Sequence, residues 1–486
     1  MFYFSNNILK RFVRLNFLLF KGDKTFFTSL VLFASVSFLS GCIGGKANIV
    51  PHVPNDNYNS LNNENSSSNT TKTSRERKNV AVEGITLENA IGVALARHPD
   101  IGRATAVVAQ SKAQIAVEKS AWYPTFQYSL DPGFSRYGGT AAGSNNNDKS
   151  SVQGTIGASQ LIYDFGRTSS RIKAADATFD KQRHLLDDTM EQVAYTMATV
   201  FIELSAAQEK IAAANRELTA LTQTRDKISQ RVKAGLSDVA DLNQADIAMQ
   251  RAKSDLLTAQ TSFDVAAGRF AEMTGIRPQR VADLASTTNF INNLRQGTDK
   301  IDDTPSVLAA TAEVRAAEQR LRLAKAERFP SVSLGVSQSK TTGNKNATND
   351  STFVGLQLSG NISVGRKEKY AIEASEAELM AAKQSRDNDM MTTRTTLGSA
   401  ETEGLGAAAR MNNAKETMGL SLSSRDLYWQ QYTLNKRPLT DVINADRDTF
   451  AAESEYITAQ SDQLNAKVKA YTAVGQFVAR IREGVQ

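Results

Sequence analysis

A long proline-free stretch from Arg167 to Lys233 constrains this chain more than any other feature. Its apolar residues recur at steps of three and four over many turns, with one interruption at Arg225. Such sustained heptads are typical of a coiled-coil helix, and a helix of this length would extend about 100 Å. Gly235 then permits a turn, and the heptads resume from Leu242 to Met273. We therefore expect a long antiparallel helical hairpin.

The second half of the chain repeats the hairpin with weaker heptads. We predict helices over residues 166–234, 236–274, 366–434 and 440–482. Alanines alternate with large apolar residues on the second of these helices, and alanine lets two helix backbones approach closely. The chain is therefore expected to be mainly α-helical and to contain two antiparallel coiled-coil hairpins.

The order of elements before each hairpin is also the same in both halves. In the first copy a helix ends at Tyr123-Pro124, two alternating segments follow, and Gly166-Arg167 begins the long helix. In the second copy Phe329-Pro330 and Gly365-Arg366 occupy the same places. This indicates an internal duplication. We place the two repeats at residues 85–300 and 301–486.

Each copy contains two segments in which apolar residues alternate with small polar ones. The predicted strands cover residues 124–137, 151–163, 331–340 and 352–364. One apolar and one polar face is the pattern of a membrane β-barrel, although an ordinary half-buried sheet is the alternative. Closure of such a barrel takes about eight strands, and open edges in lipid leave unpaired backbone groups. If the four strands lie in a membrane, several chains must share the barrel.

The N-terminus reads as a targeting segment. Basic residues precede an apolar stretch from Phe26 to Leu39, which is too short to span a bilayer. It ends in Leu39-Ser40-Gly41-Cys42, which resembles the lipobox of bacterial lipoproteins, so we predict a signal peptide over residues 1–41 and an acylated Cys42. A plain secretory signal with a chance cysteine is the alternative. Residues 42–84 are rich in Asn, Ser and Thr and are expected to form a disordered, lipidated linker.

The remaining composition argues against catalysis. Cys42 is the single cysteine of the chain, and the three histidines share no ligand spacing, so we expect neither a metal site nor a cofactor. Acidic and basic residues are interleaved, which favours solvated helix faces over a nucleic-acid site. Asp164-Phe165-Gly166 matches the metal-binding triplet of kinases, but it stands beside none of the other kinase motifs. We expect a protein that is not an enzyme.

The duplicated order of elements, the aromatic-proline strand starts and the segment Tyr163-Asp164-Phe165-Gly166-Arg167 together resemble the TolC family of outer-membrane factors. The resemblance runs from Ile85 to the C-terminus. It implies a homotrimer with a twelve-stranded transmembrane β-barrel in outer-membrane lipid and a helical α-barrel in the periplasm of a Gram-negative bacterium. It also implies two partners: a periplasmic adaptor, and an inner-membrane ABC transporter or proton-driven pump. The residue after Cys42 is not aspartate, which also favours the outer membrane.

The resemblance further implies that the turns of the two hairpins form the closed periplasmic entrance and the adaptor contact. The expected residues are Arg231, Gly235, Leu236, Asp238, Tyr432, Arg437, Asp441 and Asn444. Tyr432, Arg437 and Asp441 match positions of the family's gate network, and a pair such as Arg437 with Asp441 could hold the tips together. Asn444 departs from that network because the best-known relatives carry a second aspartate there. As an alternative, Asp238 and Asp441 are ordinary helix caps.

These features predict a passive trimeric export duct that depends on a partner for energy. We favour type I protein secretion as its route, because the Tyr163–Arg167 segment resembles members that serve it. Small-molecule or multidrug efflux is the alternative, supported by the lipobox. A periplasmic coiled-coil adaptor or scaffold is the alternative from a different class of protein.

Overall fold

A computed structural model describes residues 84–136, 148–294, 300–343 and 348–484. The predicted signal peptide, Cys42 and the linker up to residue 83 lie outside these ranges. No helix in the described ranges combines the length and the apolar character needed to cross a membrane.

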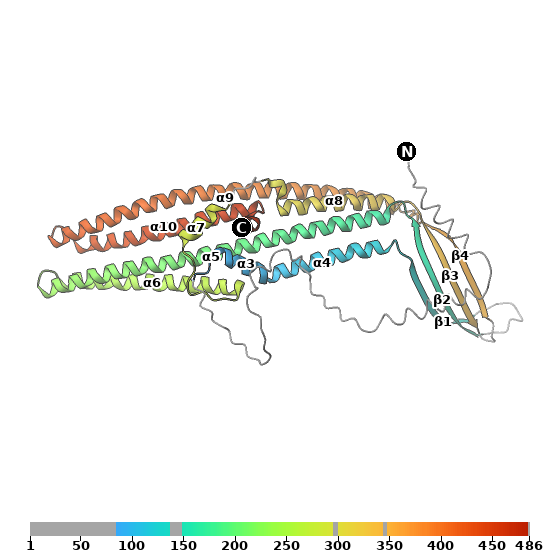
Figure 1. The fold of residues 1–486 in the computed structure, drawn as a ribbon, viewed down its shortest axis with the longest axis horizontal. Helices are drawn as coiled ribbons and strands as arrows, with labels where there is room; N and C mark the ends of the chain where they lie inside the picture. The colour runs from blue at the N-terminus through green and yellow to red at the C-terminus, as the bar shows by residue number, and fades with distance from the viewer. Residues whose placement is uncertain (1–83, 137–147, 295–299, 344–347, 485–486) are drawn as a thin grey trace. The chain divides into compact units, whose positions relative to one another are not determined.

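Two very long helices organise the chain, and each turns back into a shorter partner (Figure 1). Helix α5 packs against α6, α8, α4 and α10, while α9 packs against α10 and α8. The helices are α3 (Leu87–Arg97), α4 (Pro99–Ser120), α5 (Arg167–Lys233), α6 (Val239–Thr274), α7 (Leu284–Asn293), η1 (Ile301–Asp303), α8 (Pro305–Ala326), α9 (Lys367–Thr433), α10 (Leu439–Ala473) and α11 (Phe477–Gly484).

The duplication keeps one constant offset along the hairpins. Helices α5 and α9 both contain 67 residues, and they begin 200 residues apart in the sequence. The same offset relates the starts of α6 and α10 and the two glycines in left-handed conformation, Gly275 and Gly475. A residue of the first hairpin can therefore be compared directly with its equivalent in the second. The internal duplication predicted from the sequence is confirmed at this level.

Three helical predictions differ from the structure. The helix expected over residues 440–482 is interrupted between α10 and α11, because Gly475 has φ +68° and a side chain there would collide with the ring of Pro305. The helix expected from residue 236 begins at Val239, because the preceding residues form the turn. Pro99 divides the first helical stretch into α3 and α4, since its ring suits the first position of a new helix.

The four strands form one antiparallel sheet in the order β1-β2-β3-β4. Their bounds are β1 (Thr125–Arg136), β2 (Asp148–Tyr163), β3 (Ser331–Gly343) and β4 (Thr348–Ser359). Pairing extends three residues further into polar sequence at the start of β2 and the end of β3 than alternation predicts, because backbone hydrogen bonds do not depend on side-chain polarity. At the other end, the strand expected over 352–364 stops at Ser359, where its register with Ser331 at the start of β3 ends.

Buried residues gather in two clusters along the helices. The larger one surrounds the middle of α5, with Phe201, Phe270 and Phe477 almost fully buried. The smaller one lies toward the hairpin turns and includes Leu221, Ile228, Leu439, Val442 and Tyr432. It draws side chains from both hairpins, so the two hairpins pack on each other near their turns within one chain.

Candidate entrance site at the helical tips

The two hairpin turns have the same backbone design. Gly235 has φ +72° and its equivalent Asn435 has φ +55°, both in the left-handed region that ends many helices. In each turn the next residue, Leu236 or Lys436, donates its N–H to a carbonyl five residues back, at 2.8 and 2.9 Å. Asparagine tolerates this conformation better than most side chains do. Gly235 is therefore a turn residue in the structure.

Asp238 acts as the N-cap of α6. Its carboxylate accepts the N–H of Ala240 at 3.4 Å. The equivalent residue, Pro438, caps α10 without a side-chain hydrogen bond. Asp441 is not a cap, because it lies inside the first turn of α10 and pairs with a guanidinium. The alternative of an ordinary cap thus fits Asp238 and not Asp441.

Tyr432 joins the two hairpins. It is only 6% exposed, although it lies in the last turn of α9. Its hydroxyl lies 2.8 Å from Ser237 Oγ and donates to Asp241 Oδ2 at 3.1 Å. Ser237 in turn donates to the same carboxylate oxygen at 2.6 Å. Burial raises the pKa of Tyr432, so the phenol remains a donor at neutral pH.

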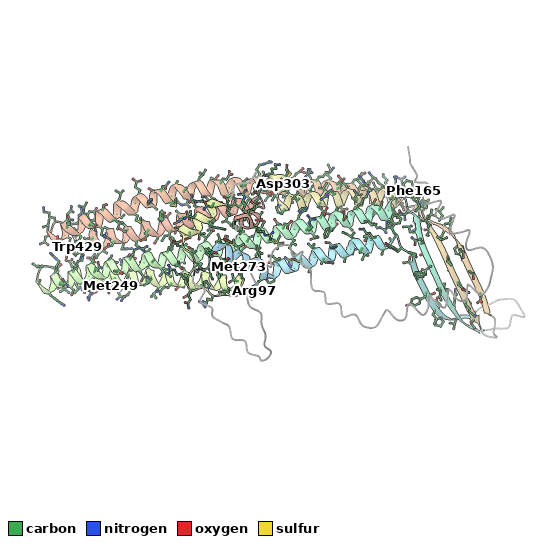
Figure 2. The ribbon with its side chains drawn as sticks, viewed as in Figure 1. Arg97, Phe165, Met249, Met273, Asp303 and Trp429 are labelled. Carbon is green, nitrogen blue, oxygen red and sulfur yellow. The ribbon has the colours of Figure 1, made fainter. Side chains whose placement is uncertain are left out.

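We call the contact of Tyr432 with Ser237 and Asp241 the joint. Basic side chains cover aromatic residues at this joint. The Arg231 guanidinium lies 5.3 Å from the centre of the Tyr432 ring, and Lys227 Nζ lies 4.6 Å from that of Trp429. Trp429 lies close to the end of α9 (Figure 2), 5.8 Å from Tyr432. Both bases come from α5 and both aromatic residues from α9, so these cation–π contacts also cross between the hairpins.

Arg437 and Asp441 pair within a single hairpin. Arg437 Nη1 donates to Asp441 Oδ2 at 2.7 Å, and its Nε donates to Gln431 at 2.7 Å. The guanidinium also stacks on Tyr428 at 3.9 Å. All four residues belong to the α9–α10 hairpin. The pair therefore stabilises one turn and does not itself link the two hairpins of a chain.

The other predicted tip residues lie apart from the joint. Leu236 is 62% exposed on the α5–α6 turn, and Asn444 is exposed on α10. Arg231 donates weakly to the Leu236 carbonyl at 3.4 Å. Sequence reasoning missed Asp241, although it is the residue 200 positions before Asp441 and the duplication could have indicated it.

A second candidate surface is the exposed apolar face of the sheet. Phe126, Ala158, Val336 and Val354 are cross-strand neighbours and form one row across all four strands. Several large side chains on this face have exposed fractions of 70% or more: Phe126, Tyr128, Leu130, Ile156, Leu356 and Leu358.

The opposite face carries small polar side chains. Gln153 and Thr155 each donate to Ser339 across the strands, at 3.1 and 3.3 Å. Phe353 is a large apolar exception on this face, and its ring packs over Gly335 and Gly355, which leave room for it. In the part of the chain that the structure describes, no group of three His, Cys, Asp or Glu side chains is placed to hold a metal ion.

The chain combines long paired helical hairpins with a sheet that has one exposed apolar face. This fold defines a subunit of a TolC-like outer-membrane channel. The chain belongs to the outer membrane efflux protein family, whose model matches residues 90–275 and 300–476. This is a family of channel proteins rather than enzymes, and its members work with periplasmic adaptors and inner-membrane pumps. The two matched segments fall in the two halves of the duplication.

Individual relatives are distant but span most of the chain. The outer membrane efflux protein BepC of Brucella suis is 20% identical over 400 residues, which cover 81% of this chain and 86% of BepC. Protein CyaE of Bordetella pertussis is 18% identical over 417 residues, covering 82% and 85%. Crystal structures of CusC share the fold with a TM-score of 0.70 at 16% identity, covering 81% of this chain and 92% of CusC.

Proposed function

We propose that three copies of this chain form a passive duct from the periplasm through the outer membrane. The four strands of each copy contribute to one twelve-stranded barrel, and the hairpins form a tunnel in the periplasm. Cys42 is acylated and adds a lipid anchor. A periplasmic adaptor docks at the tips, and an inner-membrane ABC transporter or proton-driven pump supplies the energy.

The sheet is the observation that carries this proposal. Among the described residues β1 pairs only with β2, and β4 only with β3, so both outer edges are open for pairing with other copies. Unpaired backbone groups in lipid cost several kcal/mol each, which favours closure between copies. The exposed apolar face suits lipid on the outside of such a barrel, and the serine-rich face suits water on the inside.

The joint around Tyr432 supports a gate at the entrance. It consists of hydrogen bonds between the two hairpins, one of them to a carboxylate. Such contacts are strong enough to hold a closed state and few enough for a docking partner to replace. Arg437 and Asp441 support the gate indirectly, because they fix the turn that carries Tyr432.

For the cargo, we propose an exported protein delivered by type I secretion. The segment from Tyr163 to Arg167 supports this route by its resemblance to members that serve it. Small-molecule efflux is the second candidate, supported by the Cys42 lipobox and by the efflux protein BepC among the relatives. A deletion strain separates the two. Loss of a secreted protein with unchanged drug sensitivity supports secretion, and the reverse result supports efflux.

Fractionation of cell envelopes on a sucrose gradient tests the duct itself. We expect the protein in the outer membrane as an oligomer that heating converts to monomers in gel electrophoresis. Recovery in the inner membrane, or as monomers after gentle extraction, would support the adaptor alternative instead. Cys42→Ser tests the anchor separately: fatty-acid labelling should be lost in this variant and kept in the wild type.

A further inference from the structure

Two buried carboxyl groups face each other across the contact between the hairpins. Glu217 on α5 is 7% exposed and Asp446 on α10 is 6% exposed. Both line one cavity of about 210 Å³, which Ala213, Met418 and Phe450 complete with apolar surface. We call this contact of α5 with α9 and α10 around Glu217 and Asp446 the seam. It adjoins the buried cluster that packs the two hairpins together.

Glu217 has an incomplete set of partners. Its Oε2 is inaccessible to solvent and accepts no hydrogen bond in the structure. The charged groups that act on it are Asp255 from α6 and Arg447 and Asp446 from α10. Burial and, to a smaller extent, the charges of Asp255 and Asp446 raise the pKa of Glu217 to about 7, and Arg447 offsets only part of this increase. A carboxylate left unpaired in such a place is costly, so the proton is retained to unusually high pH.

The two arginines of the cavity do not compensate Glu217. Arg216 pairs with Glu453 of α10, and Arg425 of α9 donates to its neighbour Asp426 at 2.9 Å. Both arginines that line the cavity therefore have another acidic partner, and Arg447 is the remaining base that acts on Glu217.

Asp446 is only partly compensated. Its nearest ion partner is Arg425, whose Nε lies 3.9 Å from Oδ1. Asp426 of α9 and Lys227 of α5 also act on it, with opposite effects. Burial raises the pKa of Asp446 to about 6, and the Arg425 guanidinium lowers it less than burial raises it.

The duplication supplies an internal comparison. In the first hairpin the equivalent pair, Arg225 and Asp246, has an Nε–Oδ1 distance of 2.9 Å, and both side chains are more than one third exposed. The equivalent of Glu217 in the second hairpin is Thr417. Two buried acids at one place are therefore a property of this seam and not of the repeated unit.

We propose that Glu217 and Asp446 form a proton-controlled switch, in which the neutral acids keep α5 packed on α10 and the ionised acids loosen the seam. This proposal rests on the gated duct proposed above, and it adds pH as a signal that biases the entrance. Two buried negative charges that line one cavity repel each other and are poorly hydrated, and they become hydrated when the hairpins separate.

The direction follows from the protons bound in each state. The packed seam holds protons up to about pH 7 at Glu217 and about pH 6 at Asp446. Separated hairpins expose the acids, which then ionise near their ordinary pKa values of about 4. The packed state binds more protons, so its stability falls as pH rises from about 4 to 7. Between pH 5 and pH 8 this linkage raises the opening equilibrium by about tenfold through Asp446 and by on the order of 100-fold through Glu217, which is several hundredfold together.

Trp429 offers a readout at the tip. The chain has two tryptophans, so Trp122→Phe leaves Trp429 as the single one, in contact with Lys227 of the other hairpin. In the full-length oligomer carrying this substitution, we expect Trp429 emission to shift to longer wavelength from pH 5 to pH 8. Quenching by acrylamide should rise over the same range. Emission and quenching that do not change between these pH values would overturn the proposal.

Substitutions assign the effect to the seam. In the Trp122→Phe background, Glu217→Gln with Asp446→Asn should abolish the pH-dependent shift and hold the emission at its pH 5 value. Asp446→Asn alone, a second variant in case the double one folds poorly, should reduce the shift. The matched control Asp246→Asn removes the equivalent exposed acid and should leave the shift intact. An undiminished shift in the double variant would assign the switch elsewhere and refute it.

Planar-bilayer recordings separate this proposal from the duct. The wild-type protein should form channels whose open probability rises at least tenfold from pH 5 to pH 8. Channels with a pH-independent open probability would refute the switch and leave the duct in place. If no channels form at any pH, the duct fails, and Trp429 emission still decides whether the seam responds to protons.

Discussion

The hydroxyl group of Tyr432, at the end of α9, donates a hydrogen bond to the carboxylate of Asp241 in the first turn of α6, at 3.1 Å. The two residues are 191 positions apart and belong to different hairpins. Ser237 bridges them, since its hydroxyl group contacts both side chains. Separation of the two hairpins at their turns, as the proposed gate requires, would therefore break these bonds.

Removing the Tyr432 hydroxyl group should favour the open entrance. Tyr432→Phe keeps the buried ring but leaves Asp241 without its partner from α9. A hydrogen bond to a charged group contributes about 1.5–3 kcal/mol, and the partial exposure of Asp241 lowers this to about 1 kcal/mol here. We expect a several-fold higher open probability in planar-bilayer recordings.

Tyr428→Phe is the matched control for this variant. It removes a phenol hydroxyl group one turn earlier on α9 and keeps the ring on which Arg437 stacks. Its open probability should equal that of the wild type. Equal values for Tyr432→Phe and the wild type would mean that the Tyr432 hydroxyl does not hold the entrance closed.

The two equivalent aspartates should differ in effect. Asp241 accepts hydrogen bonds from both Tyr432 and Ser237, whereas Asp441 pairs with Arg437 inside one hairpin. Asp241→Asn should raise open probability several-fold, because a neutral amide oxygen is a weaker acceptor than a carboxylate. Asp441→Asn should change it by less than twofold, since the Arg437–Asp441 pair lies within one hairpin and does not hold the two hairpins together. A larger effect from Asp441→Asn would place the gate at the Arg437 pair.

The sequence predicted the long helices well because heptads are a local and repeated signal. Helix α5 spans Arg167–Lys233, the proline-free range read directly from the residues. It could not predict that Glu217 is buried on α5, because burial depends on which helix face meets α10. For the tip residues, the sequence predicts the turns but not the contacts between the hairpins. Gly235 and Asn435 follow from turn chemistry, whereas the pairing of Tyr432 with Asp241 requires knowing how the hairpins pack.

Strand ends were less predictable than strand existence. Ile362 continues an alternating pattern, yet it is 94% exposed beyond the end of β4. Alternation identifies which residues could pair, but a strand ends where its partner ends, and here that is Ser331 at the start of β3. The helix break at Gly475 was also missed, since its cause is contact with Pro305, 170 positions earlier in the sequence.

The two faces of β4 should tolerate charge unequally. Leu356 lies on the exposed apolar face, and its neighbour Gln357 on the polar face. If lipid covers the apolar face, Leu356→Lys costs about 2–4 kcal/mol near the bilayer midplane and about 0–1 kcal/mol near the interfaces. We expect fewer heat-modifiable oligomers in outer membranes for Leu356→Lys and normal amounts for Gln357→Lys. Equal amounts for both would argue against lipid on the Leu356 face.

Glu191 should make the attachment of the last helix depend on pH. This α5 residue is 5% exposed, and its two carboxylate oxygens accept the N–H groups of Phe477 and Val478 at 3.1 Å each. Glu191 therefore caps the start of α11 although it belongs to a different helix. Burial raises the pKa of Glu191 to about 7, against the lowering effect of the two N–H groups. The folded state thus binds this proton more tightly than the unfolded state does.

The sign of the pH effect follows from this difference. Stability from the raised pKa of Glu191 is fully present below about pH 4.5 and is lost as pH rises to about 7, on the order of 3 kcal/mol in total. In thermal unfolding of the oligomer between pH 4.5 and 7.5, Glu191→Gln should flatten the decline in Tm. Glu203→Gln changes a half-exposed glutamate of the same helix and should keep the wild-type slope. An unchanged slope in Glu191→Gln would show that this carboxyl titrates alike in both states.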